Sequence, residues 1–166
     1  MDLINKATPR YNVFNEQWEF ISDSVMGGIS SGELKIVNDE NILYYKLLGH
    51  VSTDNNGGFI QFRSKIKLNE NYFSGLEIEY KNKGKNDNYF IHVTTSLTVF
   101  PWQYYKSKLQ LNKEWSVIKI PLSSFKKSNF YQPKNFTSEQ IKTIGFVAIG
   151  DDFDAELDIR RIKLYK

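Results

Sequence analysis

The chain of 166 residues carries 22 basic and 19 acidic side chains, for a net charge of +3, and it contains no cysteine. This composition excludes a disulfide framework, a thiolate nucleophile and a cysteine-ligated zinc site. Both signs of charge are spread along the chain, which argues against a nucleic-acid binder. Hydrophobic residues make up 40% and aromatic residues 15%, so we expect a folded, strand-rich single domain over residues 1–166.

The first half of the chain is dominated by alternation of apolar and polar residues. In residues 76–81, Leu-Glu-Ile-Glu-Tyr-Lys, every second side chain is apolar, which is typical of a strand with one buried face. Clusters of Gly, Asn and Asp separate such runs and favour turns. The pattern predicts an opening strand within residues 11–21, followed by strands at 33–37, 42–48, 59–66, 76–81 and 89–95.

The second half continues the pattern, with predicted strands at residues 102–109, 115–120, 144–149 and 155–164. Between them, residues 122–143 do not alternate and form either a crossover between sheets or part of a binding surface. Within this stretch, Thr137 and Gln140 have the spacing of a capping box, which predicts a short helical turn.

One change of phase interrupts the last predicted strand. Ala155 to Ile159 place apolar side chains at odd positions, whereas Ile162 and Leu164 are even, which predicts a bulge near Arg160–Arg161. Nine or ten short strands without alternating helices indicate an all-β fold. We therefore predict a two-sheet antiparallel jelly-roll sandwich with at most one or two short helical turns.

Two glycine-rich loops are candidate binding elements. Residues 22–32 either hold a ligand against their backbone or form a tight structural loop that plugs one end of the sandwich. Residues 54–63 repeat the theme, and Arg63 either binds a carboxylate or makes a surface ion pair. The candidate ligand-binding or partner-binding residues in these loops are Asp23, Met26, Gly27, Gly28, Ser30, Gly57, Gly58 and Arg63.

Aromatic side chains supply the other candidates, which are Tyr89, Trp102, Tyr104 and Tyr105. Alternation along a strand places Trp102 and Tyr104 on one face and Tyr105 on the other. Rings exposed on one face can stack on sugars, nucleobases or a partner protein. The alternative is that one set fills the core and the other covers the sheet as ordinary surface.

Support for catalysis or metal binding is weak in the sequence. The acidic residues at 152, 154, 156 and 158 share one strand face, but neighbours on a face lie about 7 Å apart, too far for all of them to bind one ion. A face paired with basic neighbours is the better interpretation than a calcium site. His50 and His92 belong to no nucleophile or metal motif. We predict no catalytic residue, no metal ion and no cofactor.

The first glycine loop also carries a family resemblance. Trp18 followed by Asp23-Ser24-Val25-Met26-Gly27-Gly28-Ile29-Ser30-Ser31-Gly32 resembles the D-x-V-M-G-G-x-S-x-G signature of the complex I intermediate-associated protein family. Weaker matches cover nearly the whole chain; they lie at Gly49–Val51, Asn56–Phe59 with Arg63, Phe73–Leu76, Trp102-Gln103, Trp115, Ile120-Pro121, Phe125 and Ile144-Gly145.

The resemblance implies a galactose-binding-like jelly roll without catalytic residues, and eukaryotic members of the family act as assembly factors for respiratory complex I. A protein partner is therefore the first expectation. A carbohydrate bound by aromatic residues of the concave sheet is the alternative, and a small-molecule enzyme with its site at the glycine-rich loop is the second alternative. We expect no nucleic acid and no membrane span. The start of the sequence resembles neither a signal nor a transit peptide, which predicts a cytoplasmic location.

Overall fold

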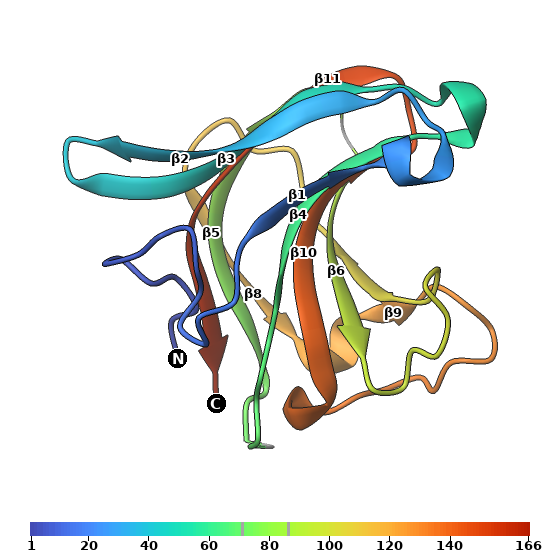
Figure 1. The fold of residues 1–166 in the computed structure, drawn as a ribbon. Coiled ribbons are helices and arrows are strands. Elements are labelled where there is room, and N and C mark those ends of the chain that lie inside the picture. The colour runs from blue at the N-terminus through green and yellow to red at the C-terminus, as the bar shows by residue number, and fades with distance from the viewer. Residues whose placement is uncertain (71, 86) are drawn as a thin grey trace.

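Two antiparallel sheets packed face to face form the fold in the computed structural model, which describes residues 1–70, 72–85 and 87–166 (Figure 1). One sheet has six strands in the order β1-β4-β10-β6-β7-β9, and the other has five in the order β2-β3-β11-β5-β8. Every strand pair is antiparallel. The predicted all-β sandwich is confirmed.

The strand bounds follow the alternating runs of the sequence. The six-stranded sheet consists of β1 (Glu19–Ser22), β4 (Phe59–Lys65), β6 (Tyr89–Thr95), β7 (Tyr105–Lys108), β9 (Lys126–Lys127) and β10 (Ile141–Ile149). The five-stranded sheet consists of β2 (Ser31–Asp39), β3 (Ile42–Val51), β5 (Gly75–Lys83), β8 (Ser116–Pro121) and β11 (Phe153–Tyr165).

Two predicted strands are shorter in the structure because polar side chains hold the neighbouring backbone in turns. The opening strand is confined to β1, since the buried Asn12 amide oxygen accepts from the Phe14 N–H at 2.8 Å and the Glu16 N–H at 3.1 Å and so holds this stretch in a turn. The predicted strand at 102–109 begins only at Tyr105, because the Gln103 side chain closes a turn before it.

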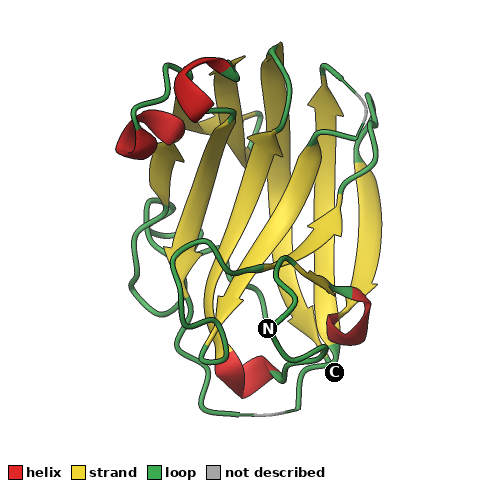
Figure 2. Cartoon of the chain, turned by 90° about the vertical axis from the view of Figure 1, so that its right-hand side faces the viewer, coloured by secondary structure: helices red, strands yellow, loops and turns green. Residues whose placement is uncertain are grey.

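Among the described residues, four short 3₁₀ turns lie at the ends of strands, whereas at most one or two helical turns were expected. Figure 2 shows the turns at the two ends of the sandwich. They are η1 (Asp23–Met26), η2 (Asp54–Asn56), η3 (Leu122–Ser124) and η4 (Ser138–Gln140). The turn predicted at Thr137 is confirmed as η4, where Gln140 Oε1 accepts from the Thr137 N–H at 2.9 Å. The stretch 122–143 also contains β9, which its sequence did not reveal.

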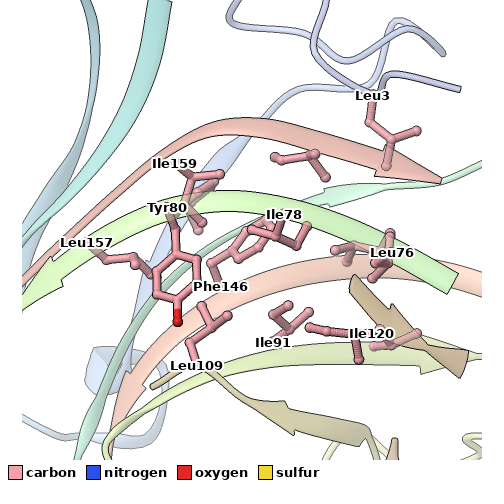
Figure 3. Close-up of a cluster of buried hydrophobic side chains, with 14 of the residues drawn as sticks. Leu3, Leu76, Ile78, Tyr80, Ile91, Leu109, Ile120, Phe146, Leu157 and Ile159 are labelled. Atoms are coloured by element: carbon pink, nitrogen blue, oxygen red, sulfur yellow. The ribbon is translucent and has the colours of Figure 1, made fainter. Parts of the chain in front are cut away.

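The core lies between the two sheets, where alternate residues of each strand meet (Figure 3). Leu76 and Ile78 of β5 and Leu157 of β11 face Ile91 and Phe146 of the six-stranded sheet. A register shift between Ile159 and Arg161 confirms the predicted bulge. It lets the strand bury apolar side chains on both sides of the shift, because one extra residue restores the inward phase.

The two chain ends lie close together at one end of the sandwich (Figures 1 and 2). The N-terminal ammonium group donates to the Leu164 carbonyl at 2.7 Å, and the Leu164 N–H donates to the Met1 carbonyl at 2.8 Å. The Leu3 N–H adds a third bond, to the Ile162 carbonyl at 2.8 Å. The first residues of the chain are thereby held against its last strand.

The outer face of the five-stranded sheet is a layer of paired charges. Lys46 Nζ lies 2.6 Å from Glu156 Oε1 and 3.0 Å from Asp158 Oδ1, and Arg160 lies 2.6 Å from Glu79. Of the four acids expected to pair with basic neighbours, Glu156 and Asp158 pair with lysines, whereas Asp154 lies against His50 and Asp152 accepts from Thr53. Because these charges satisfy one another, little of this face is left to recognise a charged ligand.

Candidate functional site

The Asp23 carboxylate holds the two glycine-rich loops together. It is fully buried and accepts hydrogen bonds from the Ser30 N–H at 3.0 Å, the Gly58 N–H at 2.6 Å, the Phe59 N–H at 3.2 Å and the Ser30 hydroxyl. Burial by itself would raise the pKa of this carboxyl, but the hydrogen bonds outweigh burial and lower the pKa below its ordinary value of 3.8. The carboxylate is thus occupied by the protein itself.

Glycines surround this carboxylate because no side chain fits beside it. A Cβ atom at Gly28 would lie closer than 3.0 Å to the Asp23 side chain, and one at Gly57 would lie 2.5 Å from Asp23 Oδ2. Figure 1 shows η1 and η2, which carry the two loops, side by side at one end of the sandwich. The geometry matches the structural plug that was one of the two predicted interpretations of this loop.

The outer surface of this plug is apolar. Val25, Met26 and Ile29 are exposed around Gly27, whose φ of +84° ends the 3₁₀ turn. Among the residues predicted for this loop, Met26 and Gly27 therefore face solvent, whereas Asp23, Ser30 and Gly58 lie inside. The loop has no exposed carboxylate at its centre for a substrate to contact.

A shallow polar cleft opens on the outer face of the six-stranded sheet, away from the plug. Its volume is about 70 Å³. Arg63 of β4 and Tyr104, two of the predicted residues, line it. The other lining residues are Gln61, His92, Thr94, Pro101, Gln103, Thr143 and Gly145. We call this feature the Arg63 cleft.

His92 forms one wall of the Arg63 cleft as a neutral ring. Its imidazole stacks on the Tyr104 ring with centroids 4.0 Å apart and planes 15° apart. Burial, and to a lesser degree the nearby Lys106 ammonium, lowers the pKa of His92 to about 3. One ring nitrogen of this residue therefore carries a proton and the other accepts hydrogen bonds at neutral pH.

The chain between β6 and β7 folds over the sheet and closes one side of the cleft. The buried Gln103 amide oxygen accepts from the Val99 N–H at 2.8 Å and from the Phe100 N–H at 3.1 Å. These two bonds shape the turn that brings Pro101 and Tyr104 to the cleft. The Tyr104 N–H donates in turn to Ser128 Oγ at 2.9 Å, which joins this loop to the one after β9.

The two joined loops expose four large aromatic rings, Phe100, Trp102, Phe130 and Tyr131, which we call the aromatic patch. Phe100 and Trp102 stack with centroids 4.8 Å apart and planes 3° apart. Trp102 is 61% exposed and Tyr131 is 87% exposed. Figure 1 shows the two loops side by side at the same end of the molecule. Exposed rings in such a group are unusual on a protein that binds nothing.

Tyr89 and Tyr105, the remaining predicted residues, lie in the core. Both are fully buried, and the Tyr105 hydroxyl donates to the Pro133 carbonyl at 2.8 Å. The Tyr89 hydroxyl donates to the Lys83 carbonyl and accepts from the Glu156 N–H, which links the two sheets. Neither ring is accessible to a ligand. Trp102 and Tyr104 lie in the turn before β7, so the alternation predicted for them along a strand does not apply.

Sequence reasoning missed most of the Arg63 cleft. In the sequence His92 belongs to no recognised motif, Gly145 appears only in a weak family match, and Gln61, Thr94 and Thr143 carry no signal of a binding role. The outward positions of β4 and β6 do share the alternating pattern of Arg63. The alternating pattern does not reveal the order of the strands in the sheet. That order places β10 between β4 and β6, which brings the outward residues of the three strands together.

The comparisons with known proteins agree with this architecture. A family model described as complex I intermediate-associated protein 30 (CIA30) matches residues 9–159. No curated protein sequence matches the chain. Within the described ranges, no helix is long and apolar enough to cross a membrane.

Several solved carbohydrate-binding modules from Clostridium thermocellum share the fold. The family 11 module of the cellulosomal cellulase Lic26A-Cel5E has a TM-score of 0.68 at 18% identity, covering 89% of this chain and 86% of that chain. A family 11 module in complex with a β-1,3-1,4-mixed-linked tetrasaccharide gives 0.67 at 18% identity, with 89% and 88% covered. The family 30 module of Cel9D-Cel44B gives 0.52 at 16% identity, with 88% and 90% covered. At these identities the likeness shows the fold alone.

Proposed function

We propose that this chain, which belongs to the complex I intermediate-associated protein 30 (CIA30) family, is a non-catalytic module that binds a protein partner in the manner of an assembly factor. The family match over residues 9–159 bears out the resemblance drawn from the Asp23–Gly32 signature. The protein partner is our inference, and the observation that carries it is the aromatic patch. Large rings clustered at a surface are the anchors that dominate protein interfaces.

The arrangement of the loops supports this proposal. Phe100 and Trp102 stack in parallel, and the loop that bears them is fixed by Gln103 and Ser128. A rigid presentation lowers the entropy that binding must overcome, because the rings need little ordering when the partner arrives. By contrast, the Asp23 carboxylate of the signature loop accepts hydrogen bonds from the Ser30 and Gly58 N–H groups. Its role is therefore structural, because it joins the two glycine-rich loops.

The experiment compares capture of partners by the wild-type chain and by a Phe100→Ala/Trp102→Ala variant. The tagged full-length chain is incubated with native lysate, and bound proteins are identified by mass spectrometry. We expect a defined set of proteins to be retained by the wild type and lost from the variant. Val117→Ala, which removes an exposed apolar side chain from the outer face of the five-stranded sheet, is the matched control and should retain the set. The same set on all three baits would contradict the proposal.

Carbohydrate binding is the second candidate, and the Arg63 cleft favours it. The cleft combines an aromatic wall with polar side chains on an outer sheet face, as small-ligand sites commonly do. The family 11 module in complex with a mixed-linked tetrasaccharide shares the fold. Calorimetric titration of the chain with β-1,3-1,4-linked tetrasaccharide tests this candidate. Binding that is abolished by Tyr104→Ala and retained by Val117→Ala would favour it over the protein partner.

A further inference from the structure

The Arg63 cleft contains a cation that the protein does not neutralise. Among the described residues, Arg63 makes no ion pair, although Glu19 is its direct neighbour on β1 in the register of the sheet. Arg63 is half-buried and lines the cleft. A guanidinium in such a position presents a planar fork of donors that matches the two oxygens of a carboxylate.

The floor of the cleft is kept open by Gly145. A Cβ atom at this position would lie 3.1 Å from Arg63 Cβ and 3.1 Å from Gln61 Oε1, so any side chain there would press against both. Its φ is not in the left-handed region, so backbone conformation does not explain the glycine. The space of about 70 Å³ is enough for a small polar group. A carboxylate is such a group, and it can reach the floor of the cleft beside Gly145.

The walls of the cleft offer further neutral hydrogen-bonding groups. His92 is uncharged, and Thr94 Oγ1 and Thr143 Oγ1 lie 2.6 Å apart, so the two hydroxyls share one hydrogen bond and retain one free proton. The Gln61 side chain lines the same space. Arg63 is thus the one charged group in the lining, and a carboxylate bound there would meet a single cation flanked by neutral donors.

The surrounding face is also basic. Lys106 on β7 lies opposite His92, Lys126 on β9 lies opposite Lys106, and Lys65 follows Arg63 by two residues on β4. Among the described residues, none of these three lysines makes an ion pair. The outer face of the five-stranded sheet, in contrast, is neutralised by its own pairs, for example Lys46 with Glu156. Arg63 and these three lysines therefore give the outer face of the six-stranded sheet a group of positive charges that make no ion pair among the described residues.

We propose that the Arg63 cleft binds the side-chain carboxylate of an acidic segment on the protein partner, with Arg63 as the ion-pairing group and the lysines of the same face attracting the rest of that segment. This rests on the proposed function and adds the chemistry of the partner. The aromatic patch borders the cleft through Pro101 and Tyr104, so one partner can contact both. Attraction between unlike charges also increases the rate of association and makes it salt-dependent.

The test uses small probes and nuclear magnetic resonance of the full chain. N-acetyl-glutamate N-methylamide mimics the acidic side chain, and N-acetyl-glutamine N-methylamide is its neutral counterpart. We expect saturable shifts of the Gly145 and Thr143 amide signals with the glutamate probe. The glutamine probe should bind at least about tenfold more weakly. Arg63→Gln and Gly145→Ala should each weaken the glutamate probe about tenfold, while Lys65→Gln, on the same strand, should weaken it less than threefold.

Two outcomes would overturn the proposal. One is equal binding of the glutamate and glutamine probes, or binding unchanged by Arg63→Gln and Gly145→Ala in variants whose thermal unfolding matches the wild type. The other is tighter binding of glucuronate than of the glutamate probe, which would assign the cleft to an acidic glycan. The result is separable from the proposed function: capture of proteins that persists in Arg63→Gln would refute the cleft alone, and carboxylate binding without any captured protein would refute the partner alone.

Discussion

At the scale of single residues, Asp23 is the side chain on which the end of the sandwich depends. Replacing it with Asn keeps the shape but sets an amide NH₂ against backbone donors, and we expect the free energy of unfolding to fall by about 2–4 kcal/mol. Because the folded pKa of Asp23 lies below 3.8, its stabilisation is complete above that value and is lost as the pH falls through the folded pKa. Urea unfolding from about pH 5 to about pH 2 should therefore show the difference between wild type and Asp23→Asn shrinking. A constant difference would contradict this account.

Of the two adjacent glycines of the signature loop, we expect the one without a positive φ, Gly28, to lose more stability when it is replaced by alanine. Gly27 has a φ of +84° but open space around it, so Gly27→Ala should cost only about 1 kcal/mol of strain. Gly28 has no such angle, yet its Cβ would collide with the fixed Asp23 side chain, so Gly28→Ala should cost more. Thermal denaturation of the two variants measures the order. A more stable Gly28→Ala than Gly27→Ala would show that Asp23 can move.

His92 should make the stability of the protein depend on pH already between pH 7 and pH 5, above the range in which Asp23 titrates. The folded imidazole has a pKa of about 3, whereas the unfolded one has its ordinary value of 6.5, so the unfolded state binds more protons between these values. The free energy of unfolding should therefore decrease as the pH falls below 6.5. In His92→Gln this decrease should be smaller between pH 7 and pH 5, measured by urea unfolding. Parallel curves for the two proteins would show that the imidazole is solvated.

At the scale of elements, the hairpin between β2 and β3 carries an avoidable strain. Its two turn residues, Glu40 and Asn41, have φ values of 46° and 66°, and Asp39 pairs with Ile42 across the turn. Asn tolerates the left-handed region better than Glu, so Glu40→Asn should raise the free energy of unfolding by up to about 1 kcal/mol. Glu40→Gln keeps the strained Cβ without the charge and is the control. A gain of equal size in both variants would assign the effect to charge.

Elements whose signal is local were predictable from the sequence, and those made by distant partners were not. The alternation of β5 and the phase change at Arg160–Arg161 are visible within a few residues, because the buried face of a strand sets them directly. The two-residue strand β9 has no pattern of its own and exists only because it pairs with β7. In the same way, the sequence before β7 has the pattern of a strand, but the hydrogen bond from the Val99 N–H to the Gln103 side chain makes it a turn.

The candidate site was less predictable, because its residues come from strands and loops that lie far apart in the sequence. Arg63 and Tyr104 were identified as residue types suited to binding, but they meet only because the strand order brings β4, β10 and β6 together. Asp23 was identified as part of an unusual loop, yet its partners at Gly58 and Phe59 come from the second glycine-rich loop. A sequence pattern reports which side of a strand faces water and does not report which strands are neighbours.

At the scale of the whole molecule, the hydrogen bonds that Met1 and Leu3 make with the last strand hold residues 1 and 166 near each other, so a short linker could join them. We therefore expect the strands to pack in the same way when their order along the chain is changed. A circular permutant that joins Lys166 to Met1 through a short flexible linker and opens the chain between Glu40 and Asn41 keeps every inter-strand pairing available. We expect it to unfold in a single cooperative transition by circular dichroism. Two transitions would mean that β2 and β3, once their connection is opened, unfold independently of the rest of the sandwich.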